Sequence, residues 1–191
     1  MNLTICNFKG GVGKSLIAHQ LITGHGFYGI ELDPYGSLAK RLPSQVLHLS
    51  LKERSLPAKT NHKDIVFDFG GFDDIKLEQA IEISNLVIVP FIPTLESVHG
   101  TLLTLKKLQY NKPILLVANM GQKQNDIKDA IIAFEEDLGQ KLDYFILPLS
   151  IALQTAVNEN KSVHDLAKCG GIKEFAYKKA SEIIKNLYCK I

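Results

Sequence analysis

The chain of 191 residues is 46% apolar and 22% charged, which is ordinary for a globular protein large enough to bury a hydrophobic core. A formal net charge of +2 is too small to indicate nucleic-acid binding by itself, and no apolar run approaches the roughly 20 residues that a membrane span requires. We therefore expect residues 1–191 to form a single domain.

Cysteine and histidine usage excludes several kinds of site. Cys6, Cys169 and Cys189 form no CxxC pair, so we expect reduced thiols in a cytoplasmic protein, without a disulfide framework or a zinc centre. The six histidines show no HxxxH spacing and predict no zinc site. The first predicted strand begins at residue 3, so we expect neither a signal peptide nor a helix-turn-helix domain before it.

The first strong pattern is a strand, a glycine-rich turn and a helix. Leu3–Phe8 is typical of a buried strand, Leu16–Ile22 is typical of a helix, and Lys9-Gly10-Gly11-Val12-Gly13-Lys14-Ser15 lies between them. Such a turn exposes backbone N–H groups to an anion, and the helix N-terminus adds partial positive charge. The segment therefore predicts a phosphate cradle, in which Lys14 contacts the β- and γ-phosphates and the Ser15 hydroxyl ligates Mg²⁺.

One departure leaves a plain glycine-rich turn open as an alternative. The strict phosphate-loop pattern has a glycine where Phe8 stands. The end of the motif, Gly13-Lys14-Ser15, is intact, and its position between a strand and a helix favours the cradle.

Further apolar runs alternate with helical patterns along the chain. The runs are Phe27–Leu32, Ile65–Phe67, Leu86–Val89, Ile114–Ala118 and Tyr144–Leu147, and the helical patterns span 75–84, 95–109, 124–139 and 172–187. Continuous apolar strands are typical of a parallel sheet that is covered on both faces. The pattern predicts an α/β fold with an open, mostly parallel sheet and helices on both faces. We interpret the less regular segment from Gly36 to Asn61 as a short helix, an extra strand at Val46–Leu51 and a surface loop.

Polar residues close three of these strands. Asp33, Asp68 and Asn119 each follow an apolar run, and ligands bind open α/β sheets at the carboxyl ends of the strands. We therefore expect the three side chains to gather on the same edge of the sheet as the phosphate loop.

The segment from Lys9 to Ser15 resembles the deviant Walker A motif, K-G-G-x-G-K-[T/S], of the ParA/MinD family of ATPases. The resemblance covers nearly the whole chain. It implies a P-loop fold, binding of ATP or ADP with Mg²⁺, and a homodimer that forms on ATP binding. In the family the first lysine, here Lys9, crosses the dimer interface and contacts the nucleotide of the partner.

The resemblance also implies which residues of the loop contact the nucleotide, namely Lys9, Gly10, Gly11, Val12, Gly13, Lys14, Ser15 and Leu16. The family usually has a second threonine where Leu16 stands, and its hydroxyl bonds the α-phosphate. Leu16 offers only its backbone N–H, so we hypothesise a lower nucleotide affinity, which an ATP titration of Leu16→Thr tests.

Two acidic positions resemble catalytic elements of the family. Asp68, after Asp64-Ile65-Val66-Phe67, resembles the Walker B aspartate, which holds Mg²⁺ through a water; Gly70 and Gly71 resemble the switch that follows it. Asp33, in Glu31-Leu32-Asp33-Pro34, resembles the second acid of the D-x-D-P element, which positions the attacking water.

Each acid also has an ordinary structural interpretation. Asp68 is alternatively a strand-end residue that caps a turn, and Asp33 is alternatively an Asp-Pro turn former. Glu31 replaces the first acid of the element, and Tyr35 stands where many relatives have glutamine. Both departures alter the local hydrogen bonding. The resemblance nevertheless implies catalytic roles for Lys9, Lys14 and Asp33, and metal-binding roles for Ser15 and Asp68.

Two residues resemble family positions around the nucleotide base. Asn119 resembles the residue whose side-chain amide reads the adenine edge, although asparagine is also common at strand ends. Pro148, with the stretch that follows it through Gln154, resembles the segment that covers the other side of the base.

The C-terminal segment is basic and amphipathic. From Lys161 to Ile191 it carries seven lysines and three acidic residues, a formal charge of +4, and apolar residues recur at helical spacing. One interpretation is a terminal helix docked on the sheet with its lysines in water. The other is a sequence-independent DNA surface displayed twice in a dimer. Membrane binding is disfavoured, because docking uses the apolar stripe.

The resemblance implies a plasmid or chromosome partition ATPase. Such proteins bind ATP, dimerise, coat nucleoid DNA in the cytoplasm and are stimulated by a centromere-binding adaptor protein. A MinD-like positioning ATPase acting at a membrane or cell pole is the alternative. Dethiobiotin synthetase lacks the front lysine, and a nitrogenase reductase needs paired cysteines for an interfacial cluster, so both metabolic relatives are disfavoured.

Overall fold

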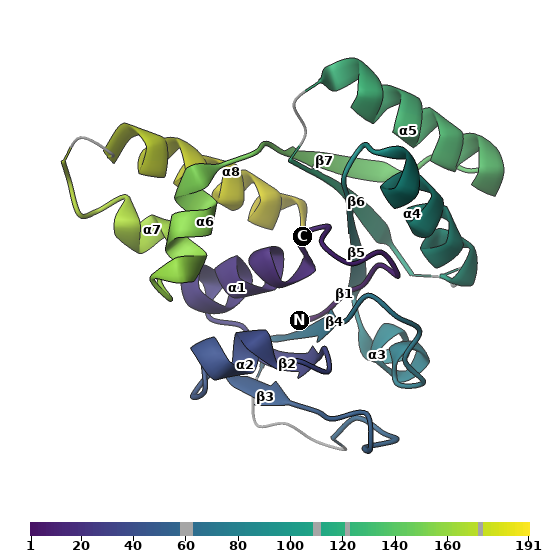
Figure 1. Cartoon of the computed structure of the whole chain (residues 1–191), viewed down its shortest axis with the longest axis horizontal. Coiled ribbons are helices and arrows are strands. Elements are labelled where there is room, and N and C mark those ends of the chain that lie inside the picture. Colours follow the sequence, from purple (N-terminus) through teal and green to yellow (C-terminus); the bar gives the residue numbers. More distant parts are fainter. Residues whose placement is uncertain (58–62, 109–111, 121–122, 172–173) are drawn as a thin grey trace.

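A seven-stranded parallel sheet forms the centre of the computed structural model, which describes residues 1–57, 63–108, 112–120, 123–171 and 174–191 (Figure 1). The strands are β1 (Asn2–Ile5), β2 (Tyr28–Leu32), β3 (Val46–His48), β4 (Ile65–Phe69), β5 (Leu86–Phe91), β6 (Ile114–Asn119) and β7 (Asp143–Leu147). They lie in the order β3-β2-β4-β1-β5-β6-β7, and each pairing is parallel. The predicted open, parallel α/β sheet is confirmed.

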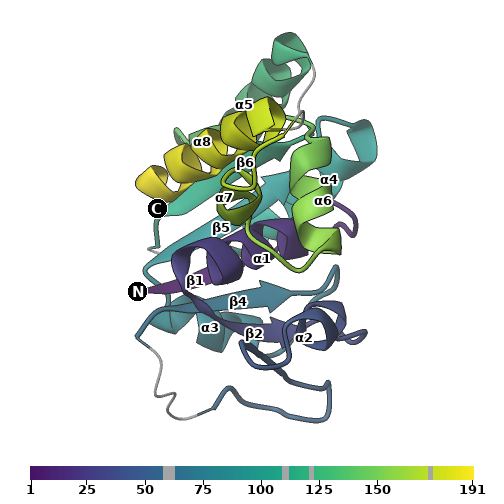
Figure 2. The same cartoon turned by 90° about the vertical axis from the view of Figure 1, so that its left-hand side faces the viewer.

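Helices cover both faces of this sheet. They are α1 (Lys14–His25), α2 (Ser37–Arg41), α3 (Leu77–Ile83), α4 (Leu95–Lys107), α5 (Gln124–Leu138), α6 (Ile151–Asn158), α7 (Val163–Leu166) and α8 (Glu174–Lys190). Side chains of α1, α2, α6, α7 and α8 share one hydrophobic cluster, and those of α3, α4 and α5 share the other. Figures 1 and 2 show the two groups on opposite sides of the sheet.

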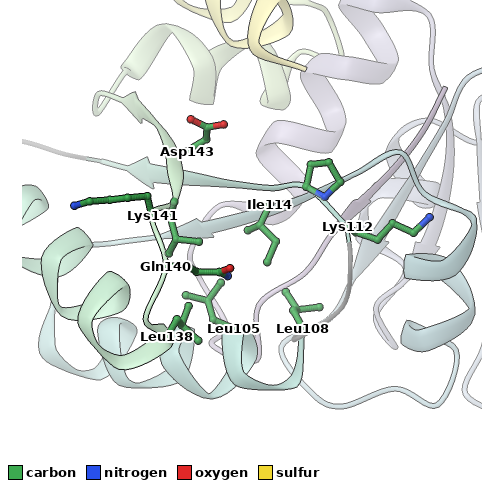
Figure 3. A pocket seen from close by; sticks show the side chains of 10 residues that line it. Leu105, Leu108, Lys112, Ile114, Leu138, Gln140, Lys141 and Asp143 are labelled. Atoms are coloured by element: carbon green, nitrogen blue, oxygen red, sulfur yellow. The ribbon is translucent and has the colours of Figure 1, made fainter.

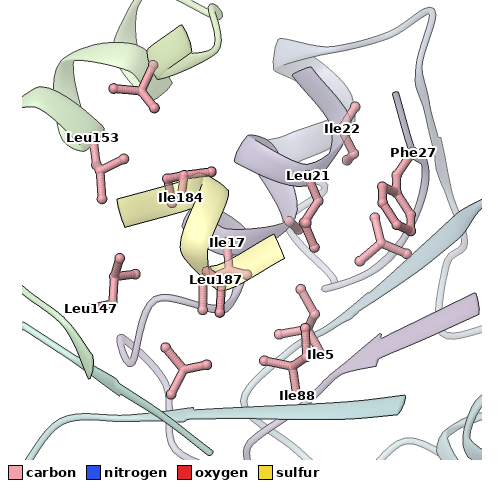
Figure 4. Packing of buried hydrophobic residues seen from close by; sticks show 14 of the residues in the cluster. Ile5, Ile17, Leu21, Ile22, Phe27, Ile88, Leu147, Leu153, Ile184 and Leu187 are labelled. Atoms are coloured by element: carbon pink, nitrogen blue, oxygen red, sulfur yellow. The ribbon is translucent and has the colours of Figure 1, made fainter. Parts of the chain in front are cut away.

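The core on the α1 side joins the middle of the sheet to the C-terminal helix. Ile17 and Leu21 of α1 are buried against a cluster that includes Ile184 and Leu187 of α8 (Figure 4). Burial of one such side chain contributes about 1.5–3 kcal/mol. This packing fixes α1, and therefore the loop before it, above the central strand β1.

The direction in which the chain winds through the sheet reverses at β1. After β2 and β3 the chain returns to place β4 beside β1, and then crosses to the other side of β1 to form β5. The carboxyl end of such a strand opens into a crevice, because its two flanking connections leave in opposite directions. The segment from Lys9 to Ser15 follows this strand.

Two strands end earlier than the sequence predicts, whereas β4 and β5 continue two residues further than predicted, to Phe69 and Phe91. Strand β1 ends at Ile5 and not at Phe8, because side-chain bonds replace the ladder there: the Asn7 amide donates to Pro90 O and Thr101 Oγ1, and Phe8 N donates to Thr104 Oγ1 of α4. Strand β3 ends at His48 and not at Leu51, because Ser50 begins a turn in which its carbonyl accepts from Glu53 N.

Helices α6 and α7 were not predicted from the sequence, although Ser150 and Ser162 cap them with their hydroxyl groups. The predicted ends of two helices, at 109 and at 172, fall outside the described residues. Cys6 is a buried core residue, as predicted, and burial raises the pKa of its thiol to about 12. Within the described ranges, no helix combines the length and the hydropathy that crossing a membrane requires.

His19 makes the stability of the fold depend on pH. Burial, reinforced by the charge of Arg41, lowers the pKa of this α1 side chain from 6.5 to about 4. Between these two values the unfolded chain binds a proton that the folded chain excludes, so the free energy of unfolding decreases as the pH falls through this window.

We predict that His19→Gln makes unfolding less sensitive to pH. Urea unfolding at pH 7, 6 and 5 should show a slope that is shallower than that of the parent by up to about 1.4 kcal/mol per pH unit. The exposed His99→Gln serves as the control and should keep the parent slope. Equal slopes in the parent and His19→Gln would contradict the assignment.

Candidate functional site

The loop from Lys9 to Ser15 presents free backbone N–H groups to the crevice. In the part of the chain that the structure describes, no N–H from Gly10 to Leu16 donates to a protein acceptor. Helix α1 begins after Gly13 with no side-chain cap and no acidic residue in its first turn. Unsatisfied N–H groups at the positive end of a helix are the donor set that a phosphate needs.

Glycine at position 13 is required by geometry. Its φ is +96°, and a Cβ there would lie 1.9 Å from Nδ2 of Asn119. The Asn119 amide donates to the Val12 carbonyl at 2.9 Å, and its oxygen accepts from Met120 N at 2.9 Å. The end of β6 therefore braces the phosphate loop directly. The contact of Asn119 with a base stays a prediction, since the bracing adds a role and excludes none.

Lys14 lies inside the loop. Its Nζ donates to the carbonyl oxygens of Asn7 at 3.0 Å and Lys9 at 3.1 Å, and its side chain is 7% exposed. Burial lowers the pKa of Lys14, and the nearby Asp68 opposes that shift. Two neutral carbonyls are modest partners for a buried ammonium group, so phosphate oxygens are a better match for its charge.

Lys9 has the opposite environment. Its side chain is exposed, and among the described residues its ammonium group has no hydrogen-bond or ion-pair partner. Its backbone is held firmly, since Lys9 N donates to Asn7 Oδ1 at 2.8 Å. The ammonium groups of the two lysines in this loop thus lie in different places: that of Lys14 is buried in the crevice, and that of Lys9 extends into solvent.

Asp68 is the strongest metal candidate. It is 1% exposed, and neither carboxylate oxygen has a hydrogen-bond partner among the described residues. Burial raises the pKa of Asp68 to about 7; the Ser15 hydroxyl lies near enough to oppose that rise without meeting the geometry of a hydrogen bond. A buried carboxylate without partners beside a hydroxyl is an oxygen donor set that suits Mg²⁺.

Asp33 lies at the carboxyl end of β2, on the same edge. Its Oδ1 accepts from Tyr35 N at 2.9 Å, which is the turn-forming bond of the alternative interpretation. Its other oxygen faces Gly70, where an added Cβ would lie 3.2 Å from Oδ2. One carboxylate oxygen therefore shapes the turn, while the other faces the loop that follows Asp68.

Glu31 has a structural role that the sequence did not reveal. It is fully buried, and its two carboxylate oxygens accept from Leu38 N at 2.9 Å and Ala39 N at 2.7 Å. These bonds cap the N-terminus of α2. Glu31 also lies opposite Asp68 in the β2–β4 ladder, so its charge helps to raise the pKa of Asp68.

Asn7 is a second supporting residue that sequence reasoning missed. Its buried amide donates to Pro90 O at 2.9 Å and Thr101 Oγ1 at 2.8 Å, while its carbonyl accepts from Lys14. Asn7 therefore ties the phosphate loop to β5 and α4. The sequence signal that could have identified this role is an asparagine placed between an apolar strand and a glycine-rich loop.

The loop after β4 touches the phosphate loop through backbone atoms. A Cβ on Gly71 would lie 2.9 Å from Gly10 N and 3.0 Å from Gly10 Cα, so only glycine fits. The same loop is anchored further on by Lys76, which is fully buried, pairs with Asp74 at 3.0 Å and donates to Glu53 O at 3.0 Å.

The edge of the sheet thus collects the predicted residues from four strands. The Lys9–Ser15 loop follows β1, Asp33 follows β2, Asp68 lies in β4 and Asn119 ends β6. Pro148 follows β7 beside Asn119, half-buried, and its base contact stays a prediction.

Another cavity lies away from this edge of the sheet. It has a volume of about 500 Å³ and is lined by Leu105, Leu108 and Leu138, with Lys112 and Lys141 on either side (Figure 3). It adjoins the first residues of β6 and β7, at the edge opposite the phosphate loop. Because ligands of open α/β sheets bind at the carboxyl edge, it does not compete with the site above.

No family model matches the chain, and no curated protein matches it by sequence. Solved structures match it over nearly its full length. Apo McdA of Cyanothece has a TM-score of 0.67 at 16% identity, covering 96% of this chain and 98% of that chain. The ParA of pNOB8 has a TM-score of 0.67 at 16% identity, covering 97% and 96%.

The MinD cell division protein of Aquifex aeolicus also matches, with a TM-score of 0.61 at 12% identity, covering 97% of this chain and 95% of that chain. The chain therefore has the fold of the ParA, MinD and McdA deviant Walker A ATPases.

We predict that Asp68→Asn stabilises the ligand-free protein and removes its response to magnesium. Removing a buried charge without partners should raise the free energy of unfolding by about 1 kcal/mol or more. Thermal unfolding should show this higher midpoint without ligand. It should also show that Mg²⁺ adds to the stabilisation by ADP in the parent and not in the variant. A lower ligand-free midpoint, or an undiminished Mg²⁺ increment, would contradict the role of Asp68.

Proposed function

We propose that this protein is an ATP-binding, slowly hydrolysing ATPase of the ParA type, which dimerises on binding ATP and acts in plasmid or chromosome partition. One observation carries the proposal. Free loop amides, the buried Lys14 ammonium and the unpaired Asp68 carboxylate meet at the carboxyl edge of the sheet. Together they supply the donors for phosphate oxygens and the acceptor for a metal ion that phosphoryl transfer requires.

The residues divide the chemistry between them. Loop amides and Lys14 bind the phosphates, and Ser15 with Asp68 holds Mg²⁺, which neutralises phosphate charge when bound. Asp33 orients the attacking water, with the oxygen that faces Gly70 available for that purpose. Little else is required, because catalysis of phosphoryl transfer is mostly positioning and charge stabilisation.

Structures with the same fold support the choice of ligand. A putative plasmid partition protein from Borrelia burgdorferi was solved with AMPPNP, a single-residue variant of Cyanothece McdA with ATP, and MinD from Pyrococcus horikoshii with Mg-ADP. We infer the same ligand class, ATP or ADP with Mg²⁺, for this chain.

Lys9 supports the dimer. An exposed ammonium group on a rigid backbone, next to a site that Lys14 already serves, is placed to act on a second molecule. We propose that Lys9 contacts the nucleotide bound by the partner subunit.

The C-terminal helix supports DNA in preference to a membrane as the surface on which the protein acts. The apolar stripe of α8, including Ala180, Ile184 and Leu187, is buried in the core, while Lys179 and Lys185 are exposed. Helix α8 therefore exposes lysines while its apolar stripe is taken up by the core, and Phe175 near its start is its one strongly exposed large apolar side chain. The ParA of pNOB8, which has this fold, was solved bound to nonspecific DNA. A cytoplasmic, nucleoid-associated location and a centromere-binding adaptor protein belong to the same proposal.

A MinD-like positioning ATPase at a membrane or cell pole is the second candidate, because MinD and McdA share the fold to a similar degree. The two candidates differ in the surface that the ATP-bound protein binds, and that difference can be measured directly.

Substitutions of the two lysines of the loop should have different effects on nucleotide binding and on dimerisation. Lys14→Ala removes the main cation at the phosphates and should weaken ADP binding about 100-fold, as expected for losing charge-assisted hydrogen bonds. Lys9→Ala should bind ADP as the parent does but stay monomeric with a non-hydrolysable ATP analogue. Titration calorimetry with ADP and light scattering with the analogue measure both effects. Unchanged ADP affinity in Lys14→Ala, or an undiminished dimer in Lys9→Ala, would refute the respective role.

The surface on which the protein acts is tested by co-sedimentation with DNA and with anionic liposomes. The parent should pellet with DNA when ATP is present and should leave liposomes in suspension. Replacing Lys179 and Lys185 with glutamine should weaken DNA binding and reduce its salt slope by about 2 per protomer. Replacing the exposed Lys123 and Lys128 beside and on α5 is the matched control. ATP-dependent pelleting with liposomes would favour the positioning role.

A further inference from the structure

A cavity of about 460 Å³ adjoins the phosphate loop at the first turn of α1. It lies between three helices, with Ser15 and Leu16 of α1, Leu38 and Arg41 of α2, and Gln154 and Asn158 of α6 among its lining residues. Its volume is within the range of small-molecule sites, and its walls mix apolar side chains with amides and hydroxyls. The cavity shares Ser15 with the loop and therefore lies directly beside it.

Arg41 gives the cavity its charge. Among the described lining residues it is the one charged side chain, and no carboxylate lines the cavity. Its Nη1 donates to Val157 O near the end of α6 at 3.1 Å, which fixes the guanidinium group between α2 and α6. Within the described ranges the other N–H groups of the guanidinium have no protein acceptor, and this group matches phosphate oxygens better than any other side chain does.

On the wall formed by α1, Leu16 follows Ser15 and has no side-chain donor for a phosphate. Leu16 contributes a free backbone N–H and an apolar side chain to the cavity. Lys14 is committed to the β- and γ-phosphates, so the α-phosphate falls to the first turn of α1. Burial is the main cause of the lowered pKa of His19, one turn further along α1, and the charge of Arg41 adds to it.

We propose that Arg41 binds the α-phosphate of the nucleotide and replaces the side-chain contact that Leu16 cannot make. The proposal rests on the nucleotide-binding function proposed above. It assigns α2 and α6 a part in ligand recognition, because the bond to Val157 positions the guanidinium group between them.

The test compares the only two arginines of the chain, Arg41 and Arg54. Arg54 is exposed and does not line the cavity, so Arg54→Gln has the same loss of charge without the contact. Calorimetric titration should show ADP and inorganic tripolyphosphate each binding at least about 10-fold more weakly to Arg41→Gln. Arg54→Gln should bind both as the parent does.

Several outcomes would overturn the proposal. Equal affinities in the parent and Arg41→Gln would show that Arg41 does not contact the ligand. Weaker binding of ADP with unchanged binding of tripolyphosphate would show that Arg41 contacts the nucleoside and not a phosphate. A lower ligand-free melting temperature of Arg41→Gln with unchanged ADP affinity would show that Arg41 stabilises the fold through its bond to Val157 and does not bind the nucleotide. A parent protein that binds no ADP would refute the proposed function itself, which separates the two failures.

A double-mutant cycle provides an independent measurement. If Arg41 and residue 16 serve the same phosphate, Leu16→Thr should raise ADP affinity more in the Arg41→Gln background than in the parent. Equal gains in both backgrounds would show independent contacts and would contradict the proposal.

Discussion

Burial of two opposite charges that do not pair with each other is the constraint on which the site depends. Lys14 and Asp68 are both covered by a sheet with helices on its two faces. Lys14 has only two carbonyl partners, and the carboxylate of Asp68 has none among the described residues. Burial therefore shifts the pKa of each group toward its neutral form. An anion at Lys14 and a cation at Asp68 would remove both conflicts together, which is the physical reason for proposing a phosphate with a metal ion as the ligand.

The scaffold keeps these charges in place through contacts that tolerate little change. Asn119 bonds the Val12 carbonyl across a glycine that leaves no room for a Cβ, and Asn7 bonds β5 and α4 from the other side. Glu31 fixes α2, which in turn places Arg41. Each contact joins segments that are distant in sequence, and together they define the loop before any ligand arrives.

The difference between local sequence patterns and contacts between distant segments explains what the sequence could predict. Continuous apolar runs gave the parallel sheet, because burial on both faces leaves one choice of residue type, and the glycine-lysine pattern gave the loop because its function needs those residue types locally. The end of β1 was predicted too late, since Asn7 and Phe8 find their partners on α4. The capping role of Glu31 and the bracing role of Asn119 were also missed, because each depends on a backbone group that only the folded chain brings near.

The backbone contact between Gly71 and Gly10 has a mechanical consequence. Asp68 and Gly71 belong to one short stretch of chain, and Gly71 meets Gly10 of the predicted phosphate loop with no side chain between them. If Asp68 holds a metal ion and the loop binds phosphate, as proposed, a shift of either segment acts on the other through this contact, and Lys76 anchors the far end of the stretch. The proposed metal and phosphate contacts are thus joined through main-chain atoms alone.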